Sequence, residues 1–391
     1  MHPFDTITAD QLRDAGSTKW TAFPGTIGAW VAEMDFGTSP EVTKAVHDAV
    51  DRAVLGYLPK ALATEMSESY ARFAADRYGW AVDPAHVRPV SDVLTALELV
   101  ITHYSRPGSP IILPTPAYMP FLTLPRTLGR DIIQVPMSVA DGPGGPRYTY
   151  DLDALDAAFA AGGHLMVLCN PHNPVGRVLT PDEMNQIAEV VDRHGGRVFA
   201  DEIHAPLTFE PHRHVPYASL SETAAGHTVT ATSASKAWNL PGMKCAQLVL
   251  SNAADIATWN EVGHHAEMQA ATLGVVAARA AYDESRAWLD DTLAYLRGNY
   301  AALVDDVAGL LPGVTVTPLE GTYLSWLDCR ELDLGDASSP AELFRTRAGV
   351  TTTDGALCGE VGKGFVRLNL AMPRPVLADA LTAMGEAAAR G

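Results

Sequence analysis

The stretch Ser233-Ala-Ser-Lys236-Ala-Trp-Asn-Leu-Pro-Gly-Met-Lys244 places a lysine just after the β-rich run Thr228–Thr232. The run predicts a buried strand, and Asn-Leu-Pro-Gly predicts the turn that follows it. The chain has only six lysines, and Lys236 alone lies at such a strand end beside small hydroxyl residues. An amine held there can condense with a carbonyl group, so Lys236 is the first candidate for a nucleophile.

Two polar motifs upstream also follow short apolar runs. The motif Cys-Asn-Pro-His-Asn173 follows Leu165–Cys169, and Ala-Asp201-Glu-Ile-His204 follows Arg197–Ala200. Continuous apolar runs of this length, bounded by Gly or Pro, predict buried parallel strands. Ligands of open α/β sheets bind at the carboxyl ends of the strands. We therefore expect both motifs to meet Lys236.

Three further features are candidate parts of a ligand site. Apolar residues at helical spacing predict a helix over Val93–Tyr104, whose N-terminus would present free N–H groups and a positive dipole end. Tyr118 lies in a proline-bounded loop after the predicted strand Ile111–Leu113. Near the end of the chain, Gly-Phe-Val-Arg367-Leu-Asn-Leu-Ala carries a guanidinium suited to a carboxylate.

These motifs, in this order, resemble the fold type I family of pyridoxal phosphate enzymes, the aspartate aminotransferase superfamily, over nearly the whole chain. The resemblance implies an α/β fold with a mainly parallel seven-stranded sheet wrapped by helices in a large domain. A smaller α/β domain would come from both chain ends. The expected boundaries are 1–45 for the N-terminal part of the small domain, 46–284 for the large domain and 285–391 for the C-terminal part.

The same resemblance implies pyridoxal 5'-phosphate as the cofactor and no metal. Lys236 would be the Schiff-base lysine, Asp201 the partner of the pyridinium nitrogen, and Tyr118 the aromatic residue stacked on the ring. Arg367 would bind the α-carboxylate of an amino-acid substrate. The other expected cofactor contacts are Asn173 and His204 near the phenolic oxygen, and Val93, Leu94, Ser233, Lys244 and a neighbouring subunit's Tyr57 at the phosphate.

Physical chemistry requires the same residue types. The cofactor accepts electrons from Cα only while its ring nitrogen is protonated, so we expect Asp201 to be ionised and paired. Lys236 must also move the Cα proton as a free amine, which desolvation favours. Lys244 stands where arginine is common and supplies a point charge. Asp92 stands where relatives often have glycine; it suits a helix cap and receives no phosphate role.

Each residue has an ordinary interpretation when it is taken alone. Lys236 could be a surface lysine, Tyr118 a core aromatic, Arg367 a residue of an edge strand, and Tyr57 a local packing residue. Asn-Pro-His-Asn-Pro is by its local chemistry a turn. The co-occurrence of all the elements in one order favours the functional interpretation.

Further segments resemble the branch of cystathionine β-lyases and cysteine-S-conjugate β-lyases related to a bacterial maltose-regulon modulator. They are Ala29–Phe36, in which Glu33 stands where aspartate is commoner, Leu55–Tyr57 and Glu320–Asp328. The resemblance implies β-elimination through a Cα carbanion, which releases a thiol, pyruvate and ammonia. An aminotransferase acting on an amino acid and a 2-oxo acid is the alternative enzyme. A regulatory or binding protein that retains the fold is the alternative of another class.

The amino-acid composition limits the kinds of partner that we expect this protein to bind. A chain of 391 residues with 47% hydrophobic content can bury a large core, and a net charge of -18 argues against nucleic acid. There is no apolar run near twenty residues and no signal-peptide pattern, so we expect a cytoplasmic protein without membrane partners. Four widely separated cysteines indicate neither disulfides nor zinc, and His212/His214 and His264/His265 lack the spacing of metal ligands. The expected partners are a small amino-acid substrate and a second copy of the chain, as a homodimer with shared active sites.

Overall fold

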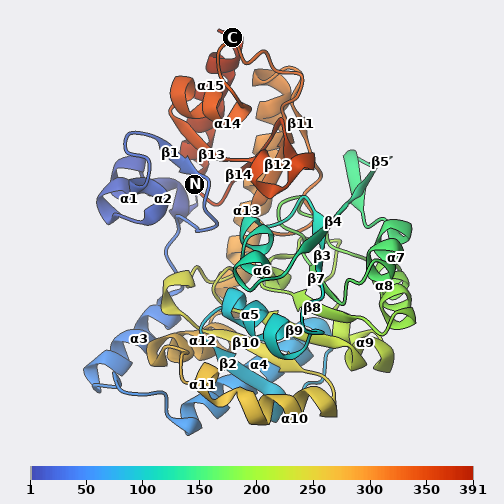
Figure 1. Cartoon of the computed structure of the whole chain (residues 1–391). Coiled ribbons are helices and arrows are strands. Elements are labelled where there is room, and N and C mark those ends of the chain that lie inside the picture. The colour runs from blue at the N-terminus through green and yellow to red at the C-terminus, as the bar shows by residue number, and fades with distance from the viewer. Residues whose placement is uncertain (1, 391) are drawn as a thin grey trace.

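The larger part of the computed structural model, which describes residues 2–390, is organised around a seven-stranded sheet (Figure 1). Neighbouring strands are parallel except at β10, which is antiparallel to both of its neighbours. The sheet confirms the predicted fold class. In spatial order the strands are β2 (Val87–Val90), β10 (Ala246–Leu250), β9 (Thr228–Thr232), β8 (Arg197–Asp201), β7 (Leu165–Cys169), β3 (Ile111–Thr115) and β4 (Ile132–Pro136).

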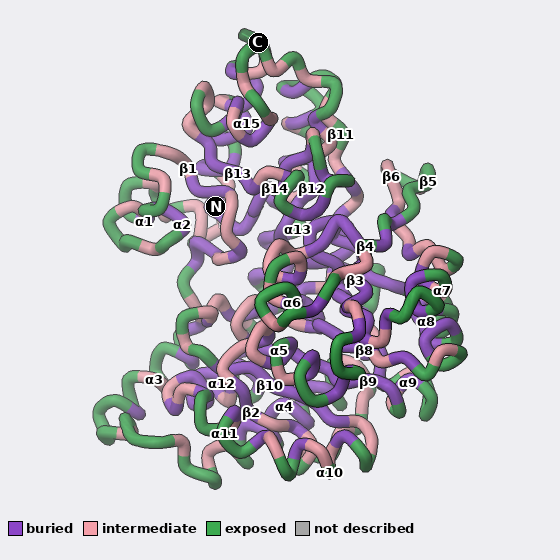
Figure 2. Tube along the Cα trace, viewed as in Figure 1, coloured by how far each residue is buried: buried purple, intermediate pink, exposed green. Residues whose placement is uncertain are grey.

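Helices cover both faces of this sheet, and alternation along the strands decides which residue meets which helix. Met166 and Leu168 of β7 pack with the helices α7 and α8, whereas Leu165 and Val167 pack with α5 on the opposite face. Such alternation with a period of two is what a strand buried on both sides requires. Figure 2 shows the resulting buried interior beneath an exposed outer layer of helices.

The helices begin at residues that satisfy their free N–H groups. Asp92 caps α5 by accepting a hydrogen bond from Thr95 N, and Thr180 and Glu183 form a capping box at α8. The α-helices are α1 (Ala9–Ala15), α2 (Thr18–Thr21), α3 (Pro40–Asp51), α4 (Lys60–Tyr78), α5 (Val93–His103), α6 (Leu124–Thr127), α7 (Leu152–Ala160), α8 (Pro181–Arg193), α9 (Glu222–Gly226), α10 (Ala253–Val262), α11 (His264–Glu267), α12 (Thr272–Glu284), α13 (Arg286–Leu310), α14 (Pro340–Leu343) and α15 (Arg374–Ala389).

A smaller five-stranded sheet combines the two ends of the chain (Figure 1). Its N-terminal strand lies parallel to β13, the other pairs are antiparallel, and α13 packs against α15 beside it. A second unit built from both ends was expected; the exact domain boundaries stay a prediction. The strands are β1 (Ile27–Ala29), β13 (Val350–Asp354), β14 (Phe365–Asn369), β12 (Leu324–Asp328) and β11 (Thr315–Val316), and a separate hairpin consists of β5 (Ser138–Gly142) and β6 (Gly145–Thr149).

A buried ion pair fastens the segment after β1 to the C-terminal part of the chain. Lys19, of which 1% is exposed, donates from Nζ to Asp35 Oδ2 (2.8 Å) and to the carbonyl of Ala371 (3.3 Å). Trp20 Nε1 donates to the other oxygen of Asp35 at 2.8 Å. Breaking a buried pair leaves an uncompensated charge, so this arrangement strongly fixes residues 30–37.

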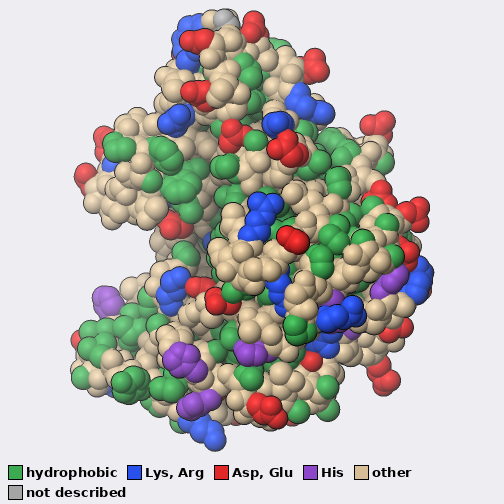
Figure 3. Space-filling model, in the orientation of Figure 1, with side chains coloured by type: hydrophobic (Ala, Val, Ile, Leu, Met, Phe, Trp, Pro, Cys, Tyr) green, Lys and Arg blue, Asp and Glu red, His purple; other side chains and the backbone are tan. Residues whose placement is uncertain are grey.

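The surface carries many acidic side chains, in agreement with the net charge of -18. Asp and Glu side chains are spread over the visible face in Figure 3 and do not gather into one patch. Among residues 2–390, no helix combines the length and the apolar character that crossing a membrane requires.

Candidate active site

A cavity of about 480 Å³ lies where the carboxyl ends of the central strands meet the smaller sheet. Its wall combines residues that follow β3, β7, β8 and β9 with residues of β14 and of the segment after β1. The fold thus brings together predicted site residues that are more than 270 positions apart in the sequence, such as Val93 and Arg367. The predicted site residues on this wall are Val93, Leu94, Tyr118, Asn173, Asp201, His204, Lys236, Lys244 and Arg367.

Lys236 lies in the turn directly after β9, and its amine points to the opposite wall. Nζ donates to the carbonyl of Ala32 at 3.0 Å. Burial, with a contribution from the nearby Arg367 charge, lowers the pKa of Lys236 to about 8. A substantial fraction of this amine is therefore neutral and nucleophilic near physiological pH.

Asp201 is the last residue of β8, one position beyond the predicted strand end, and only 4% of it is exposed. Burial raises the pKa of its carboxyl group to about 7, although Oδ1 accepts a hydrogen bond from Ile203 N (3.1 Å). Its other oxygen has only a weak contact with Cys169 Sγ at 3.9 Å. The ionised, paired state that the sequence predicts needs a cation here, and no Lys, Arg or His of residues 2–390 forms a salt bridge with Asp201.

Arg367, in the middle of β14, is a buried guanidinium without a carboxylate partner among the described residues. Only 2% of it is exposed; Nη1 donates to Asn173 Oδ1 (3.0 Å), and Nη2 to the carbonyl of Trp30 (2.9 Å) and to Thr353 Oγ1 (3.1 Å). Its Nε is buried without a partner. A buried cation surrounded by neutral acceptors is costly, so this geometry favours binding an anion from the cavity.

Tyr118 and His204 are the predicted stacking residue and the predicted histidine, and both line the cavity. Tyr118 begins the turn after β3, and its ring lies edge-on to Phe121, with centroids 5.3 Å apart. Burial, together with the charges of Lys236 and Arg367, lowers the pKa of His204 to about 3, so the imidazole is neutral. Its Nδ1 is buried and has no partner among the described residues.

The N-terminus of α5 and Lys244 form the other end of the cavity. Asp92 accepts a hydrogen bond from Thr95 N through Oδ1 (2.8 Å), which confirms the expected cap. Its Oδ2 accepts one from Lys244 Nζ at 3.0 Å. The cap and this ion pair keep the Asp92 carboxylate engaged, while the first N–H groups of the helix remain available to an anion.

Two predicted residues lie outside this wall. Ser233 is buried; its hydroxyl donates to the carbonyl of Cys245 (2.6 Å) and accepts from Ser235 N (3.0 Å). Tyr57 is 89% exposed in the loop between α3 and α4. The cofactor contacts of both residues stay predictions.

Sequence reasoning missed Ser235 and the segment Trp30–Ala32, which also line the cavity. The signal for Ser235 was its place beside Lys236, and the sequence motif around Trp30 served only to assign the subfamily.

The donor set fits pyridoxal phosphate. A helix N-terminus and a lysine suit its phosphate, a buried carboxylate without a cation suits its ring nitrogen, and the amine of Lys236 suits its aldehyde. His204 also lines the cavity, and its buried Nδ1 has no partner among the described residues. The expected contact of Arg367 with a substrate carboxylate stays a prediction.

Comparison with known families identifies the protein family of this chain. Residues 31–384 match the family described as aminotransferase class I and II. The chain belongs to this family.

Members of the family with nearly the same length are similar to this chain. Cystathionine beta-lyase of Corynebacterium glutamicum is 37% identical over 95% of this chain and 96% of its own. A structure from Corynebacterium diphtheriae, assigned as a PLP-dependent beta-cystathionase, has a TM-score of 0.91 at 38% identity and 98% coverage of both chains. The PLP-bound C-S lyase of Staphylococcus hominis has a TM-score of 0.90 at 26% identity and covers 100% of both.

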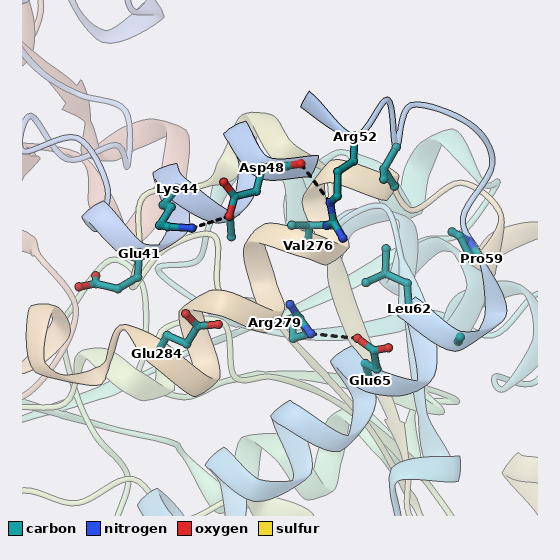
Figure 4. A pocket seen from close by; sticks show the side chains of 13 residues that line it. Glu41, Lys44, Asp48, Arg52, Pro59, Leu62, Glu65, Val276, Arg279 and Glu284 are labelled. Atoms are coloured by element: carbon teal, nitrogen blue, oxygen red, sulfur yellow. Dashed lines mark hydrogen bonds and ion pairs between the residues drawn. The ribbon is translucent and has the colours of Figure 1, made fainter. Parts of the chain in front are cut away.

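A second cavity, of about 370 Å³, lies apart from the family's cofactor site, between α3, α4 and α12 (Figure 4). Four of its charged side chains form two salt bridges, Lys44 with Asp48 at 2.5 Å and Arg279 with Glu65 at 2.9 Å, and Glu41, Arg52 and Glu284 also line it. These pairs are partly exposed and mutually compensated, unlike the charges around Lys236. The second cavity therefore has no reactive group comparable to the first.

The pKa of Lys236 predicts how cofactor capture depends on pH. Only the neutral amine attacks an aldehyde, so the rate at which the cofactor-free protein captures pyridoxal phosphate should rise through about pH 8. In Arg367→Gln the nearby positive charge is lost, and the midpoint should move to higher pH. Stopped-flow absorbance measures both profiles. A midpoint near that of an exposed lysine in the unaltered protein would contradict the assignment.

Proposed function

We propose that this protein is a pyridoxal phosphate-dependent carbon-sulfur β-lyase that cleaves L-cystathionine or other L-cysteine S-conjugates to a thiol, pyruvate and ammonia. The observation that carries the proposal is one cavity in which the amine of Lys236, with its lowered pKa, lies near the buried, carboxylate-free guanidinium of Arg367. Elimination at sulfur, as distinct from amino-group transfer, is supported by the similarity to cystathionine beta-lyase over nearly the full length of both chains.

Arg367 and Asn173 orient the substrate. The α-carboxylate of an amino acid compensates the guanidinium charge and can accept a hydrogen bond from Arg367 Nη1, whose second N–H has only a weak contact with Met119 Sδ at 3.8 Å. The bond between Arg367 Nη1 and Asn173 Oδ1 fixes the plane of the fork. A carboxylate bound there places Cα of the substrate on the side of the cavity that Lys236 occupies.

Lys236 moves the proton. When bound, pyridoxal phosphate supplies an aldehyde for the substrate's amino group and a ring that withdraws electrons from Cα. The neutral Nζ of Lys236 takes the Cα proton, and the Cβ–S bond then breaks with its electron pair on sulfur. The ammonium group of Lys236 returns this proton to the thiolate, which leaves as the thiol, and Nζ is neutral again. Water converts the remaining three-carbon enamine into pyruvate and ammonia.

Asp201 and His204 adjust the charge around the reacting atoms. The Asp201 carboxylate, in a dry position at the end of β8, holds a proton on a ring nitrogen far more effectively than an exposed carboxylate would. His204 stays neutral and contributes no competing positive charge. The cavity wall also carries the apolar side chains of Trp30, Met119 and Pro120.

Product analysis tests this function. The purified protein, loaded with pyridoxal phosphate, should release equal amounts of pyruvate and thiol from L-cystathionine or S-methyl-L-cysteine without any added 2-oxo acid. Lys236→Ala should lose at least about a thousandfold in rate, because the base that removes the Cα proton is gone. Transfer of the amino group only when a 2-oxo acid is present would assign the protein to the aminotransferases.

We further propose that the protein is a homodimer in which Tyr57 completes the partner's phosphate site. Tyr57, 89% exposed, and Leu55, 64% exposed, project from one loop that follows α3. Hydrophobic side chains gather over this region at the lower left of Figure 3. An exposed tyrosine and leucine on a short loop are typical of a protein interface.

Complementation tests the shared site. Tyr57→Ala and Lys236→Ala should each be impaired alone, whereas their co-expression should restore about a quarter of the sites, because random twofold dimers contain one intact site in half of the molecules. Asp201→Ala co-expressed with Lys236→Ala is the control and should stay inactive, since both changes affect the same subunit's site. No recovery in the Tyr57 pair would exclude a contribution in trans.

The absence of nucleic-acid and membrane partners and the cytoplasmic location stay predictions from composition and cysteine usage.

A further inference from the structure

Asn239, three residues after Lys236, joins the lysine turn to the opposite wall of the cavity. Its Oδ1 accepts a hydrogen bond from Met34 N (2.9 Å), and its Nδ2 donates to the carbonyls of Met34 (2.9 Å) and Gly37 (3.1 Å). The amide group thus pairs with both backbone groups of one residue, as a neighbouring strand would. Such a bidentate contact fixes direction as well as distance.

The segment that Asn239 holds also contacts the two residues that handle the substrate. The carbonyl of Trp30 accepts from Arg367 Nη2 (2.9 Å), and the carbonyl of Ala32 accepts from Lys236 Nζ (3.0 Å). Residues 30–34 are therefore a common support for the carboxylate-binding guanidinium and for the proton-transferring amine.

The other attachments of this segment come from the smaller sheet and from the N-terminal ion pair. Asn369 Nδ2 donates to the carbonyls of Val31 (2.6 Å) and Glu33 (2.7 Å), and Tyr323 OH donates to that of Ala32 (3.0 Å). From the lysine turn, the described hydrogen bonds to residues 30–37 come only from Asn239 and Lys236. The bond from Lys236 must break whenever its amine reacts, which leaves Asn239 as the lasting link.

We propose that Asn239 is a positioning residue that sets the distance between Lys236 and the carboxylate held by Arg367. Arg367 lies in β14, and residues 30–34 bond to Arg367, Asn369 and Tyr323, whereas Lys236 directly follows β9. While the amine is free, Asn239 supplies the described hydrogen bonds that still hold the lysine turn to this segment, and so keeps Lys236 in register with Arg367. This inference rests on the proposed β-lyase reaction and adds to it a residue that does not itself line the cavity.

The backbone conformation of Asn239 allows its three side-chain hydrogen bonds to be removed without straining the turn. Its φ is 56°, in the left-handed region that glycine and asparagine tolerate best. Asn239→Gly therefore keeps the turn and removes all three hydrogen bonds, whereas alanine would add backbone strain. Asn260→Gly, at an exposed position of α10 where the side chain accepts one long hydrogen bond from Arg88 Nη2 (3.4 Å), is the control for the change of residue type.

Two readouts test the proposal on the cofactor-loaded enzyme. In Asn239→Gly, backbone amides of residues 30–37 should exchange hydrogen faster, and kcat should fall about tenfold because the base is misplaced, while KM changes less than threefold since Arg367 keeps its support. The cofactor absorbance should be retained, and Asn260→Gly should behave like the unaltered protein. Unchanged exchange and unchanged kcat would overturn the proposal.

A second variant covers the case in which Asn239→Gly does not fold. Asn239→Asp tolerates the left-handed backbone and still accepts from Met34 N, but it loses both donated bonds. A reduced kcat with bound cofactor supports the proposal, and a normal kcat refutes it. If the unaltered protein eliminated no thiol, the proposed function would fail, whereas the exchange measurement would still decide whether Asn239 holds residues 30–37.

Discussion

Parallel pairing of β7, β8 and β9 is the constraint on which the site depends. Cys169 pairs in register with Asp201, and Asp201 with Ala231, so the three strands end at one edge of the sheet. Residues that follow these strands must therefore meet there, whatever their separation in sequence. The N-terminus of α5, the loop after β3 and the segment Trp30–Ala32 add to this edge, and β14 of the smaller sheet adds the guanidinium of Arg367. The common direction of these strands therefore determines which residues come together in the cavity.

The electrostatics of the cavity follow from burial without compensation. Asp201 has a raised pKa, Lys236 has a lowered pKa, and Arg367 has no carboxylate partner among the described residues. Each of these buried groups destabilises the protein when no ligand is bound. A protonated ring nitrogen would pair with Asp201, an aldehyde would react with the neutral amine of Lys236, and a carboxylate would pair with Arg367. By contrast, the buried pair of Lys19 and Asp35 is compensated within the chain and serves only to hold the cavity wall in place.

Local patterns predicted four strands that end at the site, β3, β7, β8 and β9, and the α5 helix, because each depends on a short run of sequence. The roles of most residues at the strand ends came from the family resemblance. The contribution of Trp30–Ala32 and the link from Asn239 could not be predicted, since they depend on side-chain bonds to backbone groups some 200 residues away. The orientation of Ser233 was also hidden: its hydroxyl turns to Cys245, which only the packed turn reveals. Asp92 was predictable as a cap, but its pairing with Lys244 was not.

Chemical trapping at Lys236 tests the central claim most directly. The protein is incubated with one equivalent of pyridoxal phosphate, reduced with borohydride and digested, and the labelled peptide is identified by mass spectrometry. The account predicts a label on Lys236, because its buried amine is the most nucleophilic lysine in the cavity, and loss of that label in Lys236→Ala without its transfer elsewhere. A label chiefly on Lys244 or on another lysine, with Lys236 unmodified, would contradict the assignment of the site.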